Sequence, residues 1–146
     1  MATNGPDAAA QPAGTRPAAL IADDEEAIAL LVADALEEEG FETTVVPDGA
    51  AALKRLEERS YDLLVTDVRM PRLDGADLVR ALRALGNPIP VIVLSGYMNP
   101  DQDRALQHLG ISADAIFEKP TSLLDVSRAA RLAFERARRP AGGAGG

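Results

Sequence analysis

Short apolar runs alternate with amphipathic stretches five times along the middle of the chain. The middle runs are almost continuous in Leu, Val and Ile, which is typical of strands that are covered on both faces. The second run carries the polar residues Glu42, Thr43 and Thr44, so we expect an edge strand there. The runs are AALIA (18–22), FETTVV (41–46), YDLLVT (61–66), PVIVLS (90–95) and ADAIF (113–117).

The stretches between the runs have the spacing of amphipathic helices. The positions expected to face the core are Ile28, Leu31, Val32, Ala35 and Leu36, then Leu53 and Leu56, then Leu78, Val79, Leu82 and Leu85, and finally Leu123, Val126, Ala130 and Phe134. Each of these helices needs a start and a stop, and the chain supplies residues of the right type at both.

Helix boundaries are marked by residues with special backbone properties. Gly40 stands where a helix end favours positive φ, Gly86 and Pro88 stop the third helix, and the fourth ends at Gly110. Asn99 and Pro100 suit the cap and first residue of the fourth helix, and Thr121 or Ser122 suits the cap of the fifth. Five βα units with short loops predict an α/β fold, a doubly wound parallel sheet with helices on both faces.

The two ends of the chain lack this periodicity. Residues 1–17 are rich in Ala, Pro, Gly and Thr, and residues 140–146 are a Gly/Ala tail. We expect both to be flexible extensions of a single domain over residues 18–139. No output module is recognisable after Arg139, so we expect either a single-domain protein or a part of a longer one.

Charged and polar side chains recur where the expected strands end. The first strand leads into Asp23 and Asp24, the third into Asp67, the fourth into Ser95 and the fifth into Lys119. Because the carboxyl ends of parallel strands share one edge, and binding sites form at that edge, these side chains should converge. Three carboxylates there would repel one another unless a hard cation such as Mg²⁺ were bound among them.

Each of these residues also has a structural explanation when taken alone. The Asp23-Asp24 pair could cap the first helix, Asp67 could lie in a loop, Ser95 could be a turn residue and Lys119 a solvated surface residue. These separate explanations do not account for the fact that all the positions fall on one edge of the sheet. Two further polar residues are assigned structural places: Asp74 as the cap of the third helix and His108, the single histidine, at the surface.

Composition narrows the classes of partner that we expect the protein to bind. A formal net charge of -8 argues against direct binding to nucleic acid or an anionic membrane, and the longest apolar runs are too short to span a bilayer. Zero cysteines exclude disulfides and thiolate chemistry and fit a cytoplasmic protein.

Four segments together resemble the response-regulator receiver domain of two-component signalling. They are LIADDEEAI, LLVTDVRMPRLDG, VIVLSG and FEKP, in the family's order and on alternating strands over roughly residues 18–138. The resemblance implies a flavodoxin-like (βα)5 fold with strand order 2-1-3-4-5. It also implies that Asp67 accepts a phosphoryl group from a sensor histidine kinase or histidine phosphotransfer protein.

The resemblance further implies a role for each site residue. Asp24, Asp67 and the main-chain carbonyl of Arg69 would bind Mg²⁺, with Asp23 acting mostly through water. Ser95 and Lys119 would bind the phosphoryl group, and the Lys119–Pro120 bond would be cis. A target protein would then be bound through the face made by the fourth helix, fifth strand and fifth helix.

Three positions depart from the family pattern or vary within it. Ile116 stands where the family usually has Tyr or Phe as a switch, so we expect altered coupling to the fourth helix, with Phe117 on the opposite face of the strand. Arg69 and Tyr97 flank the path of a hydrolytic water and are expected to set the dephosphorylation rate. The last helix carries Arg128, Arg131, Arg136, Arg138 and Arg139. They form either a docking strip for an acidic partner or a solvated helix face, and we favour the solvated face.

Three functions compete. The first is a signalling phosphoacceptor that catalyses only its own phosphorylation and dephosphorylation. The second is a pseudo-receiver that binds partners without phosphate. The third is a phosphatase of the haloacid-dehalogenase type, disfavoured because Arg69 stands where that class has a second acid. A dinucleotide-binding enzyme is disfavoured because no G-x-G-x-x-G follows the first strand.

Overall fold

The computed structural model describes residues 16–96, 100–111, 115–119 and 121–138. Five parallel strands form one sheet in the order β2-β1-β3-β4-β5. They are β1 (Ala18–Ala22), β2 (Glu42–Val46), β3 (Leu63–Asp67), β4 (Val91–Ser95) and β5 (Ile116–Glu118). The predicted fold class and strand order are confirmed, and the polar strand β2 lies at an edge as expected.

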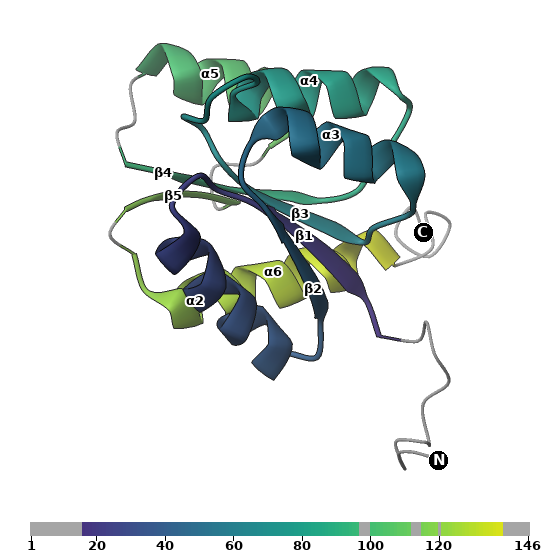
Figure 1. Cartoon of the computed structure of the whole chain (residues 1–146), viewed down its shortest axis with the longest axis vertical. Helices are drawn as coiled ribbons and strands as arrows, with labels where there is room; N and C mark the ends of the chain where they lie inside the picture. The colour runs from purple at the N-terminus through teal and green to yellow at the C-terminus, as the bar shows by residue number, and fades with distance from the viewer. Residues whose placement is uncertain (1–15, 97–99, 112–114, 120, 139–146) are drawn as a thin grey trace.

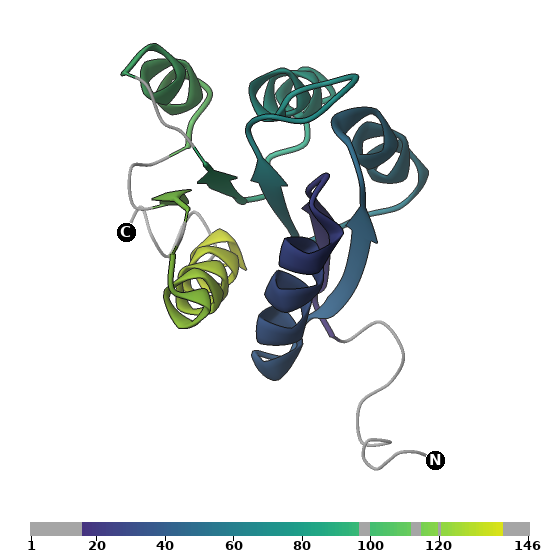
Figure 2. The same cartoon turned by 60° about the vertical axis from the view of Figure 1, so that its left-hand side comes forward.

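Within the described residues, five helices connect and cover the strands: α2 (Glu26–Glu38), α3 (Gly49–Glu58), α4 (Gly75–Ala84), α5 (Pro100–His108) and α6 (Leu123–Arg138). Figure 1 shows α3, α4 and α5 on one side of the sheet and α2 and α6 on the other. Turning the molecule shows the same three layers nearly end-on to the helices (Figure 2). No helix in the described ranges is both long and apolar enough to cross a membrane.

Two apolar clusters hold the layers together, one on each face of the sheet. Alternate residues along a strand belong to different clusters: Leu20 and Leu64 pack under α3 and α4, whereas Ile21 and Val65 pack under α2 and α6. This division explains why the middle strands are almost continuously apolar up to their carboxyl ends. Ile116 and Phe117 are divided in the same way, which confirms that Phe117 lies on the opposite face from Ile116.

Most predicted helix boundaries agree with the structure. Gly40, Gly86 and Gly110 have φ of 96°, 78° and 92°. The Asp74 carboxylate accepts a hydrogen bond from the Asp77 N–H at 2.8 Å, and Ser122 Oγ accepts one from the Asp125 N–H at 3.3 Å. Both caps are therefore confirmed, whereas the proposed Asn99 cap lies outside the described residues.

Several details differ from the expectations. Strand β5 ends at Glu118 rather than at residue 117, while residues 113 and 114 of its expected range lie outside the described residues, and β3 covers residues 63–67 rather than 61–66. Leu31 and Leu85, expected to face the core, are 50% and 53% exposed. The reason is that α2 packs through Ala29, Val32, Ala33 and Leu36, a narrower stripe than the apolar pattern suggested, and that Leu85 follows the last residue of α4.

The face of α6 that covers the sheet is anchored by an aromatic pair. Phe134 lies with its ring centroid 5.7 Å from that of Phe41, in an edge-to-face arrangement, and it is 7% exposed. Arg131 and Arg138 lie over the Phe134 ring, at 5.6 and 5.3 Å from its centroid. Two of the five arginines on this helix therefore pack against an aromatic ring.

We predict that Phe134→Ala lowers the free energy of unfolding by about 3–5 kcal/mol, because it removes a buried ring and leaves a cavity. The matched control is Leu132→Ala on the same helix, which is 52% exposed and should change stability by about 0.5 kcal/mol or less. Urea denaturation followed by circular dichroism measures both. Equal losses in the two variants would contradict this account of how α6 packs.

Candidate functional site

The candidate site lies at the carboxyl ends of β1, β3 and β5, on both sides of the point where the strand order reverses. The chain leaves β1 toward β2 on one side and leaves β3 toward β4 on the other, so β1 and β3 are neighbours. Asp23 directly follows β1, Asp67 is the last residue of β3, and Lys119 directly follows β5. Parallel sheets place their binding sites at this kind of edge.

Asp67 is buried at the rim of the core, where only 6% of the residue is exposed. The backbone after it is fixed by two hydrogen bonds of Val68: the Val68 N–H donates to the Leu94 carbonyl at 3.2 Å, and the Val68 carbonyl accepts from the Gly75 N–H at 2.7 Å. The chain therefore turns sharply after Asp67 and returns to it at the start of α4.

Gly75 makes this return possible. A Cβ at that position would lie 2.3 Å from the Asp67 carbonyl oxygen and 2.9 Å from Val68 Cα, distances that real Cβ atoms do not reach. The Asp74-Gly75 pair thus does two things: Asp74 caps α4, and Gly75 lets α4 begin against the backbone of the site. The sequence predicted the cap but not the close approach.

The loop between β3 and α4 also rests on the start of α3. A Cβ on Gly49 would lie 2.0 Å from the Leu73 carbonyl oxygen, so only glycine fits there. Arg72 has a φ of 73°, which is unfavourable for a residue other than glycine. Its Nε lies 3.3 Å from Asp48 Oδ2. Asp48 also caps α3 through Oδ1, which accepts a bond from the Ala51 N–H at 2.8 Å.

Lys119 is the centre of the polar constellation. Its Nζ lies 3.1 Å from Asp23 Oδ2, 3.2 Å from Asp67 Oδ2 and 3.3 Å from Glu25 Oε1. Its side chain is 16% exposed, and its backbone N–H donates to the Ser95 carbonyl at 2.6 Å. The explanation of Lys119 as a solvated surface residue is therefore wrong, as is the explanation of Asp67 as a loop residue.

The electrostatics of the two central groups follow from burial and from each other. Burial raises the pKa of Asp67 above its ordinary value, the Lys119 charge opposes this, and the nearby Asp23 charge raises it further. Burial lowers the pKa of Lys119, but the hydrogen bond to Asp23 and the charges of Asp67 and Asp23 outweigh this, so that it lies above the ordinary lysine value. Ionising Asp67 is thus costly here even with Lys119 beside it, and a further cation would lower that cost.

The oxygen atoms present suit a hard divalent cation. Asp23, Glu25 and Asp67 each offer a carboxylate oxygen, and these oxygens lie within 4.8 Å of one another. Oxygen ligands of this kind are what Mg²⁺ prefers. Asp24, the other acid predicted as a ligand, is exposed and lines the same cavity together with Arg69. Whether Asp24 and the Arg69 carbonyl bind Mg²⁺ stays a prediction.

Glu25 is the member of this group that the sequence reasoning missed. It lies one residue beyond the predicted Asp pair, where an acidic residue is usual at a helix start. Its backbone N–H donates to Asp23 Oδ1 at 2.9 Å, which turns the chain so that the Glu25 side chain meets Lys119. The run of acids in the sequence was the available signal, but only the turn shows which of them reach the lysine.

The structure describes some of the remaining predicted site residues but not all of them. Ser95 is fully buried at the end of β4, and Ile116 is half-buried in the cluster under α3 and α4. Arg69 is exposed at the rim, and its N–H donates to Asp67 Oδ1 at 3.4 Å. Tyr97 and Pro120 lie outside the described residues. The effects expected of Arg69, Tyr97 and Ile116 remain predictions. His108 is exposed, as expected.

Comparison with known proteins assigns the family. The model of the response regulator receiver domain matches residues 19–131, so the chain belongs to this family. The receiver domain of Francisella response regulator 1452 superposes with a TM-score of 0.76 at 33% identity, over 84% of this chain and 99% of that one. The structure thus confirms the resemblance that the four sequence segments indicated.

Among curated relatives, the transcriptional regulatory protein PrrA of Mycobacterium tuberculosis is 38% identical over 112 residues, covering 77% of this chain and 47% of PrrA. The alkaline phosphatase synthesis transcriptional regulatory protein PhoP of Bacillus subtilis is 33% identical over 117 residues, covering 80% of this chain and 48% of PhoP. The chain therefore spans about half the length of the curated relatives it matches.

We predict that Asp67→Asn raises the stability of the metal-free protein at pH 7. Because folding raises the pKa of Asp67, the folded state keeps a proton that the unfolded chain has lost, and stability falls as pH rises from the ordinary value of 3.8 through the raised value. The gain from the substitution should therefore vanish as pH falls below 3.8. Thermal unfolding in EDTA over a pH series measures it.

The same pair of proteins provides the control for metal binding. Adding Mg²⁺ at 100 times its Kd should stabilise the wild type by about 2.7 kcal/mol, and the Asp67→Asn variant by less at the same concentration. A variant that is less stable than the wild type in EDTA at pH 7 would contradict the assigned electrostatics.

Proposed function

We propose that this receiver domain is a phosphoacceptor: Asp67 takes a phosphoryl group from a phosphohistidine in a reaction that depends on Mg²⁺. The observation that carries the proposal is the contact of Lys119 Nζ with Asp67 Oδ2 at 3.2 Å and with Asp23 Oδ2 at 3.1 Å. It brings a nucleophilic carboxylate, a fixed cation and a second acid together from three strands. Phosphoryl transfer requires little of a protein beyond such positioning and charge neutralisation.

The residues would share the reaction in the following way. An Asp67 oxygen forms a bond to phosphorus as the bond from phosphorus to the imidazole nitrogen breaks, and that nitrogen keeps the electron pair. Lys119 and Ser95 would bind the phosphoryl oxygens. Asp24, Asp67 and the Arg69 carbonyl would hold Mg²⁺, with Asp23 acting mostly through water. The bound ion would offset the charge of the acids and of the phosphoryl group. The chain catalyses only its own modification, so we do not regard it as an enzyme.

The partner that donates the phosphoryl group is proposed to be a sensor histidine kinase or a histidine phosphotransfer protein in the cytoplasm. An apolar groove opens directly beside the acids and shares Glu25, Gly96 and Lys119 with the acidic cavity. Ile28, Leu31 and Leu123 line it, and Leu31 is 50% exposed. A helix that carries the phosphohistidine could bury apolar side chains there while its imidazole reaches Asp67.

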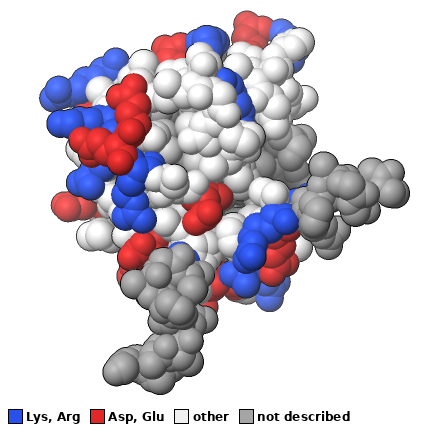
Figure 3. Space-filling view, turned by 90° about the vertical axis from the view of Figure 1, so that its right-hand side faces the viewer, with Lys and Arg blue, Asp and Glu red and all other residues white. Residues whose placement is uncertain are grey.

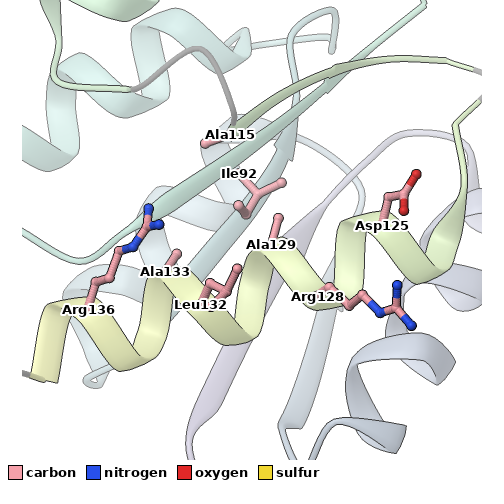
Figure 4. A pocket seen from close by; sticks show the side chains of 8 residues that line it. All are labelled: Ile92, Ala115, Asp125, Arg128, Ala129, Leu132, Ala133 and Arg136. Atoms are coloured by element: carbon pink, nitrogen blue, oxygen red, sulfur yellow. The ribbon is translucent and has the colours of Figure 1, made fainter.

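We propose that the target protein binds the side of α6 opposite this groove, as part of the α5–β5–α6 face. Figure 4 shows the hollow along α6, with Ala129, Ala133 and Leu132 beside Ile92 and Ala115. Arg128 and Arg136 project from the same helix at its rim, together with Asp125. A partner with apolar and acidic side chains would complement this surface better than a uniformly charged one.

Charge elsewhere fits protein partners rather than a nucleic acid. On the face of the described residues seen in Figure 3, basic and acidic side chains are interspersed around a broad neutral band. A nucleic-acid backbone requires clustered positive charge. We therefore keep the proposal of no direct nucleic-acid or membrane contact for these residues. The relatives named as transcriptional regulators are about twice as long as this match.

We predict that acetyl phosphate and Mg²⁺ add one phosphoryl group to the wild type and none to Asp67→Asn. Intact-mass spectrometry measures the increment, and hydroxylamine should remove it because an acyl phosphate is labile to that nucleophile. Lys119→Met should lose most of the reactivity because the phosphoryl oxygens lose their fixed cation. An unmodified wild type at saturating Mg²⁺ would instead support a pseudo-receiver, and continuous release of phosphate from a phosphomonoester would support a phosphatase.

We further predict that Leu31→Asp lowers the rate of transfer from a phosphorylated histidine kinase at least tenfold more than the rate from acetyl phosphate. The reason is that a charge in the groove opposes protein docking but lies off the path of a small donor. Leu30→Asp is the control, because Leu30 is 51% exposed on the same helix and does not line the groove. Equal effects of the two substitutions on transfer from the kinase would overturn the docking proposal.

A further inference from the structure

The three carboxylates around Lys119 differ sharply in how firmly they are held. The side chains of Asp23 and Asp67 are 3% and 8% exposed, whereas that of Glu25 is 64% exposed. Asp23 is further fixed because its Oδ1 accepts a bond from the Glu25 N–H at 2.9 Å. Glu25 is therefore the partner that Lys119 can release at least cost, because water can take over both of its carboxylate oxygens.

Release of one partner is required if Asp67 is phosphorylated. An ammonium group has three N–H donors, and each has a carboxylate at 3.1–3.3 Å in this structure. A phosphoryl oxygen can bind Lys119 only by replacing one of these acceptors. Asp23 is buried and Asp67 carries the oxygen that attacks phosphorus, which leaves Glu25 as the group that moves away.

Glu25 also stands at the entrance. It lines both the acidic cavity, with Asp67 and Arg69, and the adjoining apolar groove, with Ile28 and Leu31. A phosphoryl donor that enters this cavity to reach Asp67 comes close to this carboxylate. Its negative charge opposes an anionic donor, and it opposes a dianion more than a monoanion.

We propose that Glu25 is a specificity-determining residue: it occupies the third position on Lys119 until the phosphoryl group replaces it, and its charge selects against small anionic phosphodonors in favour of a protein donor. A small donor has only its own charge and the metal to attract it, and so it meets this repulsion without compensation. A protein donor that docks in the groove gains apolar burial that offsets the repulsion. The proposal rests on the phosphoacceptor function proposed above for the same site.

The test compares Glu25→Gln with Glu26→Gln at saturating Mg²⁺. Glu26 is also exposed, in the first turn of α2, so the control removes the same charge from the same helix end without the contact to Lys119. Glu25→Gln should speed phosphorylation by acetyl phosphate, a dianion, about three- to tenfold, and phosphorylation by phosphoramidate, a monoanion, by a smaller factor. The difference should shrink at about 1 M salt, where the Debye length is roughly 3 Å.

A second readout moves in the opposite direction and does not depend on phosphorylation. Removing a carboxylate from the group of three should weaken Mg²⁺ binding severalfold in Glu25→Gln but not in Glu26→Gln. The side-chain signals of isotope-labelled lysine report it, because the chain has only Lys54 and Lys119. Glu25→Asp should restore both properties in part, because the charge is kept. A general folding defect would lower the rate and the affinity together.

The outcomes separate this inference from the function it rests on. If neither acetyl phosphate nor phosphoramidate modifies the wild type, the proposed function is wrong. A wild type that is modified at Asp67, but at rates that Glu25→Gln and Glu26→Gln alter equally for both donors, overturns only the role of Glu25. Faster reaction with no dependence on donor charge or salt would overturn it as well.

Discussion

One lysine side chain holds the site of this protein together. Lys119, at the end of the last strand, meets Asp23 from the first strand and Asp67 from the third, all within 3.2 Å. Two carboxylates buried this closely would repel each other, and burial itself opposes their ionisation. The ammonium group offsets part of this cost, and its own pKa is raised by the same contacts. The fold around the site can be understood as the means of keeping these three groups in contact.

Backbone geometry does most of that positioning. The strand order makes β1 and β3 neighbours, so that two acids emerge side by side. After Asp67 the chain turns back so tightly that Gly75 lies against the Asp67 carbonyl, and the turn itself rests on Gly49. A side chain at either glycine would push the loop outward, and Arg69 with it. The chemistry of the site therefore depends on residues that carry no reactive group.

Much of the fold and of the site could be predicted from the sequence because both follow from local rules. Continuous apolar runs indicate strands with two covered faces, and a parallel sheet brings their carboxyl ends to one edge. Asp23, Asp67, Ser95 and Lys119 were found in this way. The resemblance of four short segments to a family then supplied the strand order, which periodicity alone does not determine.

What could not be predicted depends on how elements pack and turn. Leu31 fits a helical stripe by spacing, yet α2 approaches the sheet through small residues such as Ala29 and Ala33, so Leu31 remains outside. Glu25 is one acid in a run, and only the turn at Asp23 selects it as a partner of Lys119. The end of β5 could not be predicted for a similar reason, because Glu118 belongs to the strand although it is charged and directly precedes Lys119.

The most direct test of the central contact is the titration of the Lys119 side chain by NMR in metal-free protein. With two lysines in the chain, Lys54→Arg leaves Lys119 as the only lysine signal. We expect a midpoint above the ordinary value of 10.5, and a lower midpoint once Asp67→Asn removes one of the charges that raise it. A midpoint at or below 10.5 that Asp67→Asn leaves unchanged would contradict it.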